Sequence, residues 1–191
     1  MDDYRLESLW TRRKLYTRKL ARDSWGAVVM PDFSLWRDSP RAQQIWNVYR
    51  SRVLACEWQA AGVVVAPNLS WSDEESYEYC FTGMPVHAPV VFCQARSLRA
   101  RDRDMFRQGL RAAVERLVPR HVVFYGQARW LTSGDLPAGP RYTRLISAID
   151  GVREVIGREV EVDIDVDVDI ESIQPWRKSE SRSRIARCVD T

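Results

Sequence analysis

The stretch that decides the fold is residues 89–125, PVVFCQARSLRARDRDMFRQGLRAAVERLVPRHVVFY. It begins with the apolar run 89–93 and ends with the apolar run 121–125, and both runs have the length of a strand. Between them, an apolar stripe at three- and four-residue spacing predicts a helix over residues 101–118, which Pro119 ends. The stripe consists of Phe106, Leu110, Ala113, Val114 and Leu117. A strand, a helix and a second strand at this spacing predict parallel strands joined by a right-handed crossover.

The same unit recurs on the N-terminal side of this stretch. Residues 26–31 and 63–67 are short apolar runs, and their continuous hydrophobicity is typical of strands covered on both faces. Between them, Ser39 as N-cap and Pro40 in the first turn predict the start of a helix, and Gly62 predicts its end. The face of this helix that we expect to be buried comprises Ala42, Ile45, Tyr49, Val53, Cys56 and Ala60.

Two further helices are predicted outside these units. Residues 4–22 form a basic amphipathic helix, with Leu6, Leu9, Trp10, Tyr16 and Leu20 near one face. The cations Arg12, Arg13, Lys14, Arg18 and Lys19 cover the remainder of that helix. They are candidates for phosphate contacts with nucleic acid, or they form the solvated face of a helix that packs on the sheet. Residues 72–75 predict a capping box before a short helix through Phe81.

These elements predict an α/β fold, with βα repeats around a parallel sheet of four or more strands that is either open or part of a distorted TIM-like barrel. Residues 1–158 are expected to form a single domain, with one more helix, or a strand and a helix, within 142–156. Residues 159–171 alternate apolar residues with seven carboxylates, which predicts either an edge strand or a low-complexity extension. Residues 172–191 predict a polar, basic tail without fixed structure.

The composition excludes several classes of protein. A chain of 191 residues with 45% hydrophobic residues can bury a single core. No apolar run approaches the roughly 20 residues of a membrane helix, and the charged N-terminal segment is unlike a secretory signal, so we expect a cytoplasmic protein. The four cysteines, Cys56, Cys80, Cys93 and Cys188, lie too far apart to indicate zinc, and Cys56 and Cys93 are expected to be buried. Neither cysteines nor histidines indicate a metal site, and no pattern indicates an organic cofactor.

Polar residues follow each of the four predicted strands. Because ligands bind at the carboxyl ends of parallel strands, these residues are expected to converge on one site. They are Asp32, Ser34, Asn68, Ser70, Trp71, Gln94 and Tyr125. In this interpretation Asp32 is the catalytic carboxylate, the two serines and two amides orient a polar ligand, and Trp71 or Tyr125 stacks on a ring.

Each of these residues also has a purely structural interpretation. Asp32 and Ser34 are residue types that satisfy backbone groups in loops. Trp71 is of a type that more often fills a core than contacts a ligand. The evidence for a site is therefore the coincidence of four strand ends, and no single residue carries it.

Several motifs resemble those of a known family. They are residues 31–40 (PDFSLWRDSP), 44–50 (QIWNVYR) and 70–76 (SWSDEES), followed by Cys80-Phe81 and Tyr125-Gly126. Together they resemble the bacterial and phage proteins catalogued as domain of unknown function 4417, over about residues 2–127. The segment 2–10 is similar to the family's early Asp-Asp-Tyr segment, which an apolar strand precedes in related chains. Either this chain starts further upstream, which would place Asp2 and Asp3 at the same site edge, or it lacks the strand that would bring them there. The resemblance implies an α/β fold and a phage or mobile-element setting in a bacterial host cell.

A second resemblance concerns the fold alone. A strand ending in Pro-Asp, a long helix, a strand ending in Pro and a later strand ending in Tyr-Gly are similar to part of a tRNA-guanine or DNA-deazaguanine transglycosylase barrel. Such an analogy does not transfer a function. Three hypotheses remain open: an enzyme acting on a nucleotide or nucleic-acid base through Asp32, a non-catalytic protein that binds DNA or a host protein through the basic helix, and a structural domain whose strand-end residues only cap loops. The oligomeric state is not indicated by the sequence.

Overall fold

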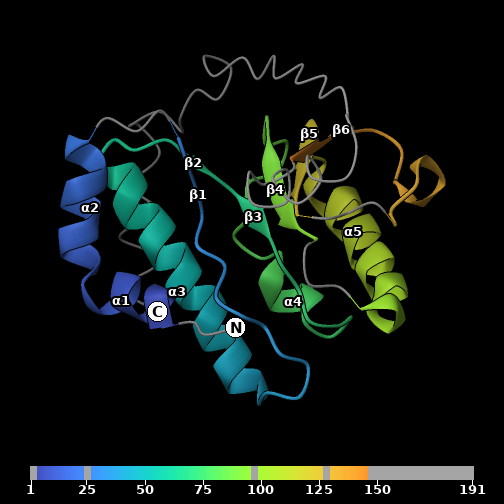
Figure 1. Ribbon diagram of the computed structural model, residues 1–191, viewed down its shortest axis with the longest axis horizontal. Coiled ribbons are helices and arrows are strands. Elements are labelled where there is room, and N and C mark those ends of the chain that lie inside the picture. Colours follow the sequence, from blue (N-terminus) through green and yellow to red (C-terminus); the bar gives the residue numbers. More distant parts are fainter. Residues whose placement is uncertain (1–3, 24–26, 96–98, 127–129, 146–191) are drawn as a thin grey trace, which may run out of the picture.

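The computed structural model describes residues 4–23, 27–95, 99–126 and 130–145 (Figure 1). Its helices are α1 (Tyr4–Thr11), α2 (Arg13–Arg22), α3 (Arg41–Ala60), α4 (Tyr77–Cys80) and α5 (Arg103–Leu117), with 3-10 turns η1 (Ala100–Asp102) and η2 (Ser133–Asp135). Its strands are β1 (Val28–Val29), β2 (Val65–Ala66), β3 (Asn68–Leu69), β4 (Val91–Gln94), β5 (His121–Tyr125) and β6 (Arg141–Leu145). The predictions for residues 146–191, including the acidic stretch and the basic tail, lie outside the described residues.

All strand pairs of the described chain are parallel, as the sequence predicted. One sheet has the order β3-β4-β5-β6, and β1 pairs with β2 in a second, two-stranded sheet. Pro67 separates β2 from β3, and its carbonyl accepts a hydrogen bond from the Phe92 amide at 2.8 Å. The extended segment 65–69 therefore pairs with β1 through its first half and with β4 through its second half. Among the described residues no pairing joins β6 to β1, so the sheet is open and the barrel alternative is not realised.

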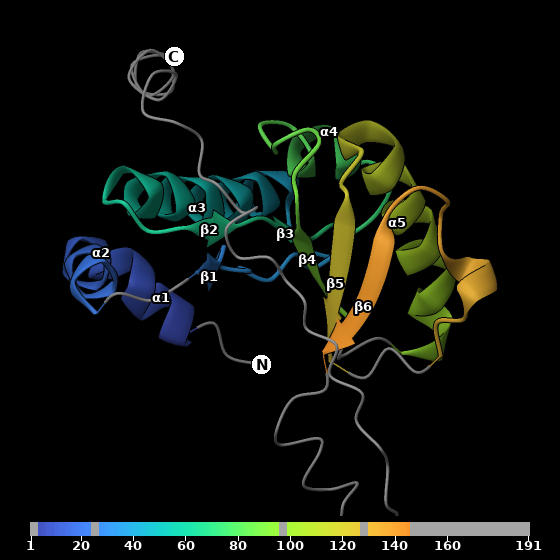
Figure 2. The same ribbon diagram turned by 90° about the horizontal axis from the view of Figure 1, so that it is seen from above.

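The main core lies between the four-stranded sheet and α5. All five residues of the predicted α5 stripe are buried, and they pack against Val91, Cys93, Val122 and Phe124 from one face of the sheet. The opposite face carries a small separate cluster, Ala66, Val90 and Val123. In Figures 1 and 2, α5 lies at one end of the molecule, α1–α3 at the other and α4 between them. The prediction of a buried Cys93 is confirmed, because its side chain is almost completely enclosed.

Helix α3 contradicts the prediction of its buried face. Ala42, Ile45, Tyr49, Cys56 and Ala60 are exposed and Val53 is half-buried. The buried face instead holds the polar residues Gln44, Asn47, Arg50 and Ser51, followed by Leu54, Ala55 and Trp58. The physical reason is that the polar side chains satisfy the loops beneath the helix, which places the neighbouring apolar stripe in solvent. The helix also begins one residue later than predicted, because Pro40 and not Ser39 occupies the N-cap position.

Two other local predictions were wrong. The single helix expected over residues 4–22 is divided at Arg12, which leaves helical geometry (φ −110°, ψ 27°). The Thr11 hydroxyl donates to the Glu7 carbonyl at 2.9 Å, a side-chain bond of the kind that bends helices. The capping box of α4 also differs, because Asp73 Oδ1 accepts from the Ser76 amide at 3.0 Å while the Ser72 hydroxyl turns to Gln44.

Replacing Leu110 with alanine tests the core. Leu110 has no exposed surface, so Leu110→Ala should lower the free energy of unfolding by about 2–5 kcal/mol through lost burial and a residual cavity. Leu15 is 54% exposed, and the matched variant Leu15→Ala should change it by no more than about 0.5 kcal/mol. Urea denaturation followed by circular dichroism measures both, and equal effects of the two variants would contradict the assignment of the core.

Candidate functional site

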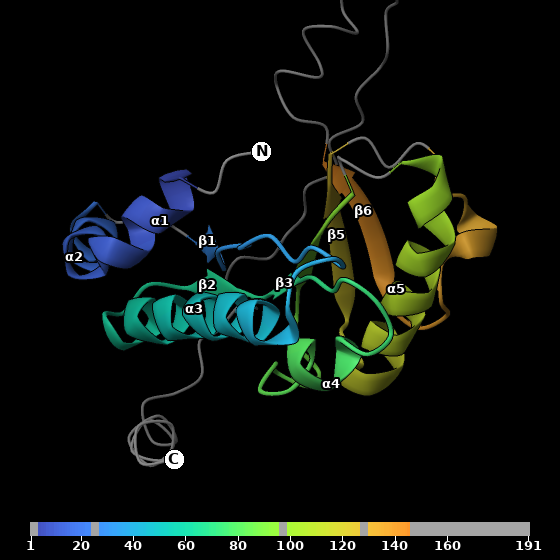
Figure 3. The same ribbon diagram turned by 90° about the horizontal axis from the view of Figure 1, so that it is seen from below.

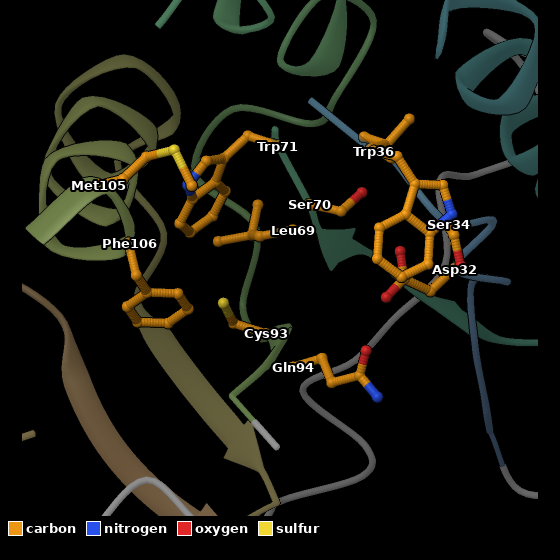
Figure 4. Close-up of a pocket in the computed structure, with 11 residues that line it drawn as sticks. Asp32, Ser34, Trp36, Leu69, Ser70, Trp71, Cys93, Gln94, Met105 and Phe106 are labelled. Carbon is orange, nitrogen blue, oxygen red and sulfur yellow. The ribbon is translucent and has the colours of Figure 1, made fainter. Parts of the chain in front are cut away.

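A cavity of about 220 Å³ lies at the carboxyl ends of the strands (Figure 4). Its lining comes from the loop after β1, from the end of β3 and the residues after it, from the end of β4, and from the first turn of α5. The lining residues are Asp32, Ser34, Leu35, Trp36, Leu69, Ser70, Trp71, Cys93, Gln94, Met105 and Phe106. Five of the seven residues singled out in the sequence, Asp32, Ser34, Ser70, Trp71 and Gln94, are therefore brought together around one space.

The cavity has two chemically different walls. Figure 4 shows Trp71, Met105 and Phe106 on the α5 side, and Asp32, Ser34 and Trp36 on the opposite side. The ring centroids of Trp71 and Phe106 are 5.3 Å apart, and Phe106 is only 4% exposed, so the aromatic surface of that wall is mostly the Trp71 ring. One side of the cavity thus carries a carboxylate and hydroxyl groups, and the opposite side carries aromatic rings. This combination suits a planar ligand that carries hydrogen-bonding groups on its edge.

Trp71 packs against α5 at Gly109, where the helix carries no side chain. A Cβ built on Gly109 would lie 2.0 Å from Trp71 Nε1 and 2.2 Å from Trp71 Cε2. The indole therefore lies directly on the helix backbone, and Phe81 contacts it edge-on with centroids 6.1 Å apart. The structural interpretation of Trp71 and the ligand interpretation are both compatible with this position, because a half-buried ring can pack on one side and line a cavity on the other.

The loop after β1 is positioned by the buried polar face of α3. Asn47 Nδ2 donates to the Ser34 carbonyl at 2.7 Å, and Asn47 Oδ1 accepts from the Arg50 guanidinium. Arg50 is ion-paired with Glu7 of α1 and lies 4.0 Å above the centroid of the Phe33 ring. The loop that carries Asp32 is thus connected through α3 to α1.

The loop after β3 is held by a second group on the same helix face. Gln44 Oε1 accepts from the Ser72 hydroxyl at 2.5 Å and from the Tyr79 hydroxyl at 3.0 Å, while Gln44 Nε2 donates to the Ser39 carbonyl. One side chain therefore binds the loop after Trp71, helix α4 and the start of α3. Both polar loops of the cavity depend on α3 for their position.

An ion pair joins segments from the two sides of the cavity. Arg37 Nη2, in the loop after Trp36, lies 3.5 Å from Asp102 Oδ1 in η1. Both residues are next to cavity-lining segments, and the Arg37 side chain is exposed. The Asp102 side chain is only 19% exposed, so the pair is partly shielded from solvent.

Asn68 and Tyr125 do not line the cavity. Asn68 is buried, and its Oδ1 accepts a hydrogen bond from the Tyr125 hydroxyl at 3.4 Å. Burial raises the pKa of the Tyr125 phenol, and the negative charge of Asp32 raises it further. Tyr125 therefore stays protonated at neutral pH, and its hydroxyl donates to Asn68.

Cys93 lines the cavity but is unsuited to act as a thiolate. Burial raises its pKa, and the Asp32 carboxylate adds to the shift. The same two influences act on Cys93 and Tyr125, which places the Asp32 charge close to both. Within the cavity lining, Asp32 is the carboxyl group.

Some lining residues were missed in the sequence and some predicted ones fall elsewhere. Met105 and Phe106 come from the start of α5, where helical spacing predicts only core. Trp36 lies two residues beyond Ser34 in the same loop, and no pattern in the surrounding sequence predicts that it lines the cavity. Asp2 and Asp3 lie outside the described residues, so their expected place near the site stays a prediction.

The basic residues of α1 and α2 lie away from this cavity. Arg12, Lys14, Arg18 and Lys19 are exposed, whereas Arg13 is half-buried and its Nε lies 3.0 Å from Glu57 Oε1 of α3. Figures 1 and 3 show α2 and α5 at opposite ends of the molecule. The cavity and the basic surface are therefore separate candidates.

The described ranges contain neither a metal-ion cluster nor a membrane-spanning helix. No group of three or more His, Cys, Asp or Glu side chains in them is placed to hold a metal ion. None of the described helices has the length and hydropathy needed to cross a bilayer.

The model of the family described as Domain of unknown function (DUF4417) matches residues 1–143. The chain belongs to this family. The sequence resemblance over residues 2–127 is thereby confirmed, and the DUF4417 match extends through most of β6. All cavity-lining residues lie within the matched range.

Two phage proteins are similar to this DUF4417 chain. The Gene 1 protein of Mycobacterium phage L5 is 37% identical over 144 residues, which cover 74% of this chain and 62% of the phage protein. The Gene 1 protein of Mycobacterium phage D29 is 39% identical over 145 residues, which cover 74% of this chain and 52% of the phage protein. The match thus spans a little more than half the length of these relatives. No solved structure matches the chain.

Replacing Gly109 tests how the aromatic wall is built. Alanine raises helix propensity by about 1 kcal/mol, but the new Cβ would overlap Trp71, so Gly109→Ala should lower the free energy of unfolding by about 1–3 kcal/mol. Gly134 is the control, since its Cβ would meet only Thr132 Oγ1 at 3.9 Å. Thermal unfolding followed by circular dichroism measures both, and a stabilised Gly109→Ala variant would show that Trp71 does not lie on this helix.

Proposed function

We propose that the strand-end cavity binds a nucleotide or nucleic-acid base and that Asp32 is the carboxylate that acts on it, as acid–base group or nucleophile. The observation that supports this is the position of the Asp32 carboxylate across the cavity from the Trp71–Phe106 wall. A base stacks on aromatic rings through its face and presents ring nitrogens and exocyclic groups at its edge. The chemistry of both walls fits that pair of surfaces.

The remaining polar groups fit the edge of a base as well. Ser34 and Ser70 offer hydroxyl groups that donate and accept, and Gln94 offers an amide with both capacities. The exposed ring of Trp36 lies beside Asp32 at the same wall. A mixed set of donors and acceptors discriminates between bases more strongly than apolar contacts alone.

The size of the cavity limits the ligand. Its volume of about 220 Å³ lies below the range of about 300–1,000 Å³ that is typical of small-molecule sites. Such a space takes one base or a similar ring and excludes a duplex. If the substrate is a nucleic acid, the reacting base must therefore be unpaired or turned out of the stack.

Asp32 is the lining residue best suited to proton transfer or nucleophilic attack. Cys93 is kept as a thiol by burial and by the charge of Asp32, so the thiol is a poor competitor. Ser34 and Ser70 have no histidine in the cavity lining that would activate a hydroxyl. A carboxylate in contact with a base edge accepts or delivers protons without a further cofactor.

Asp32→Asn tests the assignment. The variant should weaken binding of the preferred base by tenfold or more and abolish turnover, because the amide can neither carry the charge nor transfer the proton. Calorimetric titration with a panel of bases, nucleosides and nucleotides measures binding, and chromatography of the mixtures detects conversion. Asp38→Asn is the control, since Asp38 is an exposed carboxylate of the same loop outside the cavity lining.

The thermal midpoints of the two variants should stay close to that of the native chain. If Asp32→Asn binds and converts every panel member as the native chain does, the cavity is not an active site of this kind. If no panel member binds the native chain, the cavity is a packing defect or takes a different ligand class, and the proposal fails.

A second proposed function is nucleic-acid binding through α1 and α2, with host-protein binding as its competitor. It is favoured by the exposure of Arg12, Lys14, Arg18 and Lys19. Phosphate contacts release counterions, so affinity should fall steeply with salt. Binding of a host protein through shape and apolar contacts should depend on salt much less.

Arg18→Ala combined with Lys19→Ala tests the phosphate contacts. For two lost contacts, the slope of log K against log salt should become shallower by about 1.4–1.8, depending on whether the ligand is single- or double-stranded. Arg13→Ala is the control with a smaller expected change, because Arg13 is already paired with Glu57. Fluorescence anisotropy of a labelled oligonucleotide across a salt series gives the slopes, and an unchanged slope in the double variant would rule out these contacts.

A further inference from the structure

The outer face of α3 carries a group of aromatic residues that the cavity does not use. Trp46 and Tyr49 are 46% and 49% exposed, and Ile45 beside them is 41% exposed. The rings of Trp46 and Tyr49 are stacked, with centroids 5.4 Å apart and planes 21° apart. We call this stacked pair the α3 platform. Exposed aromatic clusters of this kind mark interaction surfaces more often than isolated apolar residues do.

The platform is held rigid by α1. The ring of Trp10 meets Trp46 edge-on, with centroids 5.4 Å apart and planes 82° apart, and it meets Tyr49 at 6.3 Å. The Arg13 guanidinium lies 5.0 Å from the Trp10 ring, and the Arg50 guanidinium lies 5.8 Å from the Trp46 ring. A ring pair supported in this way loses little conformational freedom when a ligand stacks on it.

The electrostatics next to the platform favour an anionic partner. The acids of the described part of this region are already paired, Glu7 with Arg50, Asp23 with Arg22 and Glu57 with Arg13. By contrast, no carboxylate of the described residues pairs with the exposed cations Arg12, Lys14, Arg18 and Lys19. Helix α2 packs against α3 (Figures 1 and 2). Arg13 at the start of α2 lies 5.0 Å from the Trp10 ring that contacts the platform, so the α2 cations continue from the platform along α3. The surface therefore combines half-exposed aromatic rings with uncompensated positive charge.

We propose that the α3 platform stacks the bases of a single-stranded nucleic acid whose phosphates lie along Arg12 and the exposed cations of α2. Single strands are bound in this way because every unpaired base has a π-face and every nucleotide carries a phosphate. A duplex hides its base faces and can use only the cations. A second copy of this chain is disfavoured because its own basic helices would meet those of the first copy.

This inference rests on the second function proposed above and deepens it, because it names the single strand as the form of nucleic acid that is bound. It does not depend on the chemistry assigned to Asp32. The platform residues do not line the cavity, so the two sites are tested with different variants and different ligands.

The test compares a labelled oligothymidylate with a duplex of the same length by fluorescence anisotropy. Trp46→Ala and Tyr49→Ala should each weaken single-strand binding by about tenfold, which corresponds to about 1.4 kcal/mol, within the range measured for one stacked base. Their duplex affinity and the salt slope of single-strand binding should stay unchanged, because the cations remain. Trp46→Phe should recover most of the affinity, since it restores an aromatic face.

Ile45→Ala is the matched control. Ile45 is exposed on the same helix but has no π-face, so its loss should change single-strand affinity by less than twofold. If Ile45→Ala weakens binding as much as Trp46→Ala does, the surface binds through apolar contact, as a protein partner would, and the stacking proposal is overturned. Equal loss of duplex and single-strand binding in the Tyr49→Ala variant also overturns it.

Circular dichroism shows whether each variant is folded. If Trp46→Ala does not fold, Tyr49→Ala and Trp46→Phe together still test the proposal. If the native chain binds no oligonucleotide at all, both the inference and the second proposed function fail. If it binds with a normal salt slope but without preference for single strands, only the platform inference fails. Binding of single bases to the cavity, measured with Asp32→Asn, is unaffected by either outcome.

Discussion

The rest of the structure depends on the burial of the Arg50 guanidinium under α3. A buried charge is costly unless it is paired and hydrogen-bonded. Arg50 Nη1 pairs with Glu7 of α1 and Nη2 donates to Asn47 of its own helix, while its buried Nε has no partner among the described residues. Asn47 in turn binds the backbone of Ser34. One charge therefore connects α1, α3 and the loop that carries Asp32. Removing Glu7 would leave the Arg50 charge without its counter-ion, and removing Asn47 would take away a hydrogen-bond acceptor from it.

The requirement to satisfy that charge determines which way α3 faces. Gln44, Asn47 and Arg50 lie on one stripe, and the loops after β1 and β3 need hydrogen-bond partners from it. The helix therefore turns a polar face inward over its first half. Its aromatic residues face outward as a result, and the two candidate sites lie on opposite faces of one helix. The buried polar side chains of α3 position the loops of the cavity, and its exposed aromatic side chains form the α3 platform.

The sequence predicts the parallel α/β core well, because α5 and the strands around it follow simple rules. Leu110 and Leu117 recur at helical spacing, Pro119 ends the helix, and the runs on either side have strand length. The rule that polar residues converge at the carboxyl ends of parallel strands also places Asp32, Ser70 and Gln94 around one space. These inferences use local patterns and the geometry of parallel sheets, and both are properties of nearly every α/β protein.

Other features depend on contacts between distant residues, which no local pattern records. The inward face of α3 follows from Glu7 and Ser34, which are far from Asn47 and Arg50 in sequence, so hydrophobic periodicity selects the wrong face. Asn68 and Tyr125 were expected to line the cavity, but they hydrogen-bond to each other outside its lining. Met105 and Phe106 join the lining because α5 begins beside the loop after β3. What each cavity residue binds stays a prediction.

The interruption between β2 and β3 at Pro67 has a consequence for the cavity. The wall that carries Asp32 follows β1 of the two-stranded sheet, whereas Trp71 on the aromatic wall follows β3 of the four-stranded sheet. The extended segment 65–69 belongs to both sheets, because its two halves pair with different neighbours on either side of Pro67. Across the opening, the Arg37–Asp102 ion pair links the two wall segments. Because the carboxylate and the aromatic rings belong to different sheets, the width of the cavity is set where the two sheets meet.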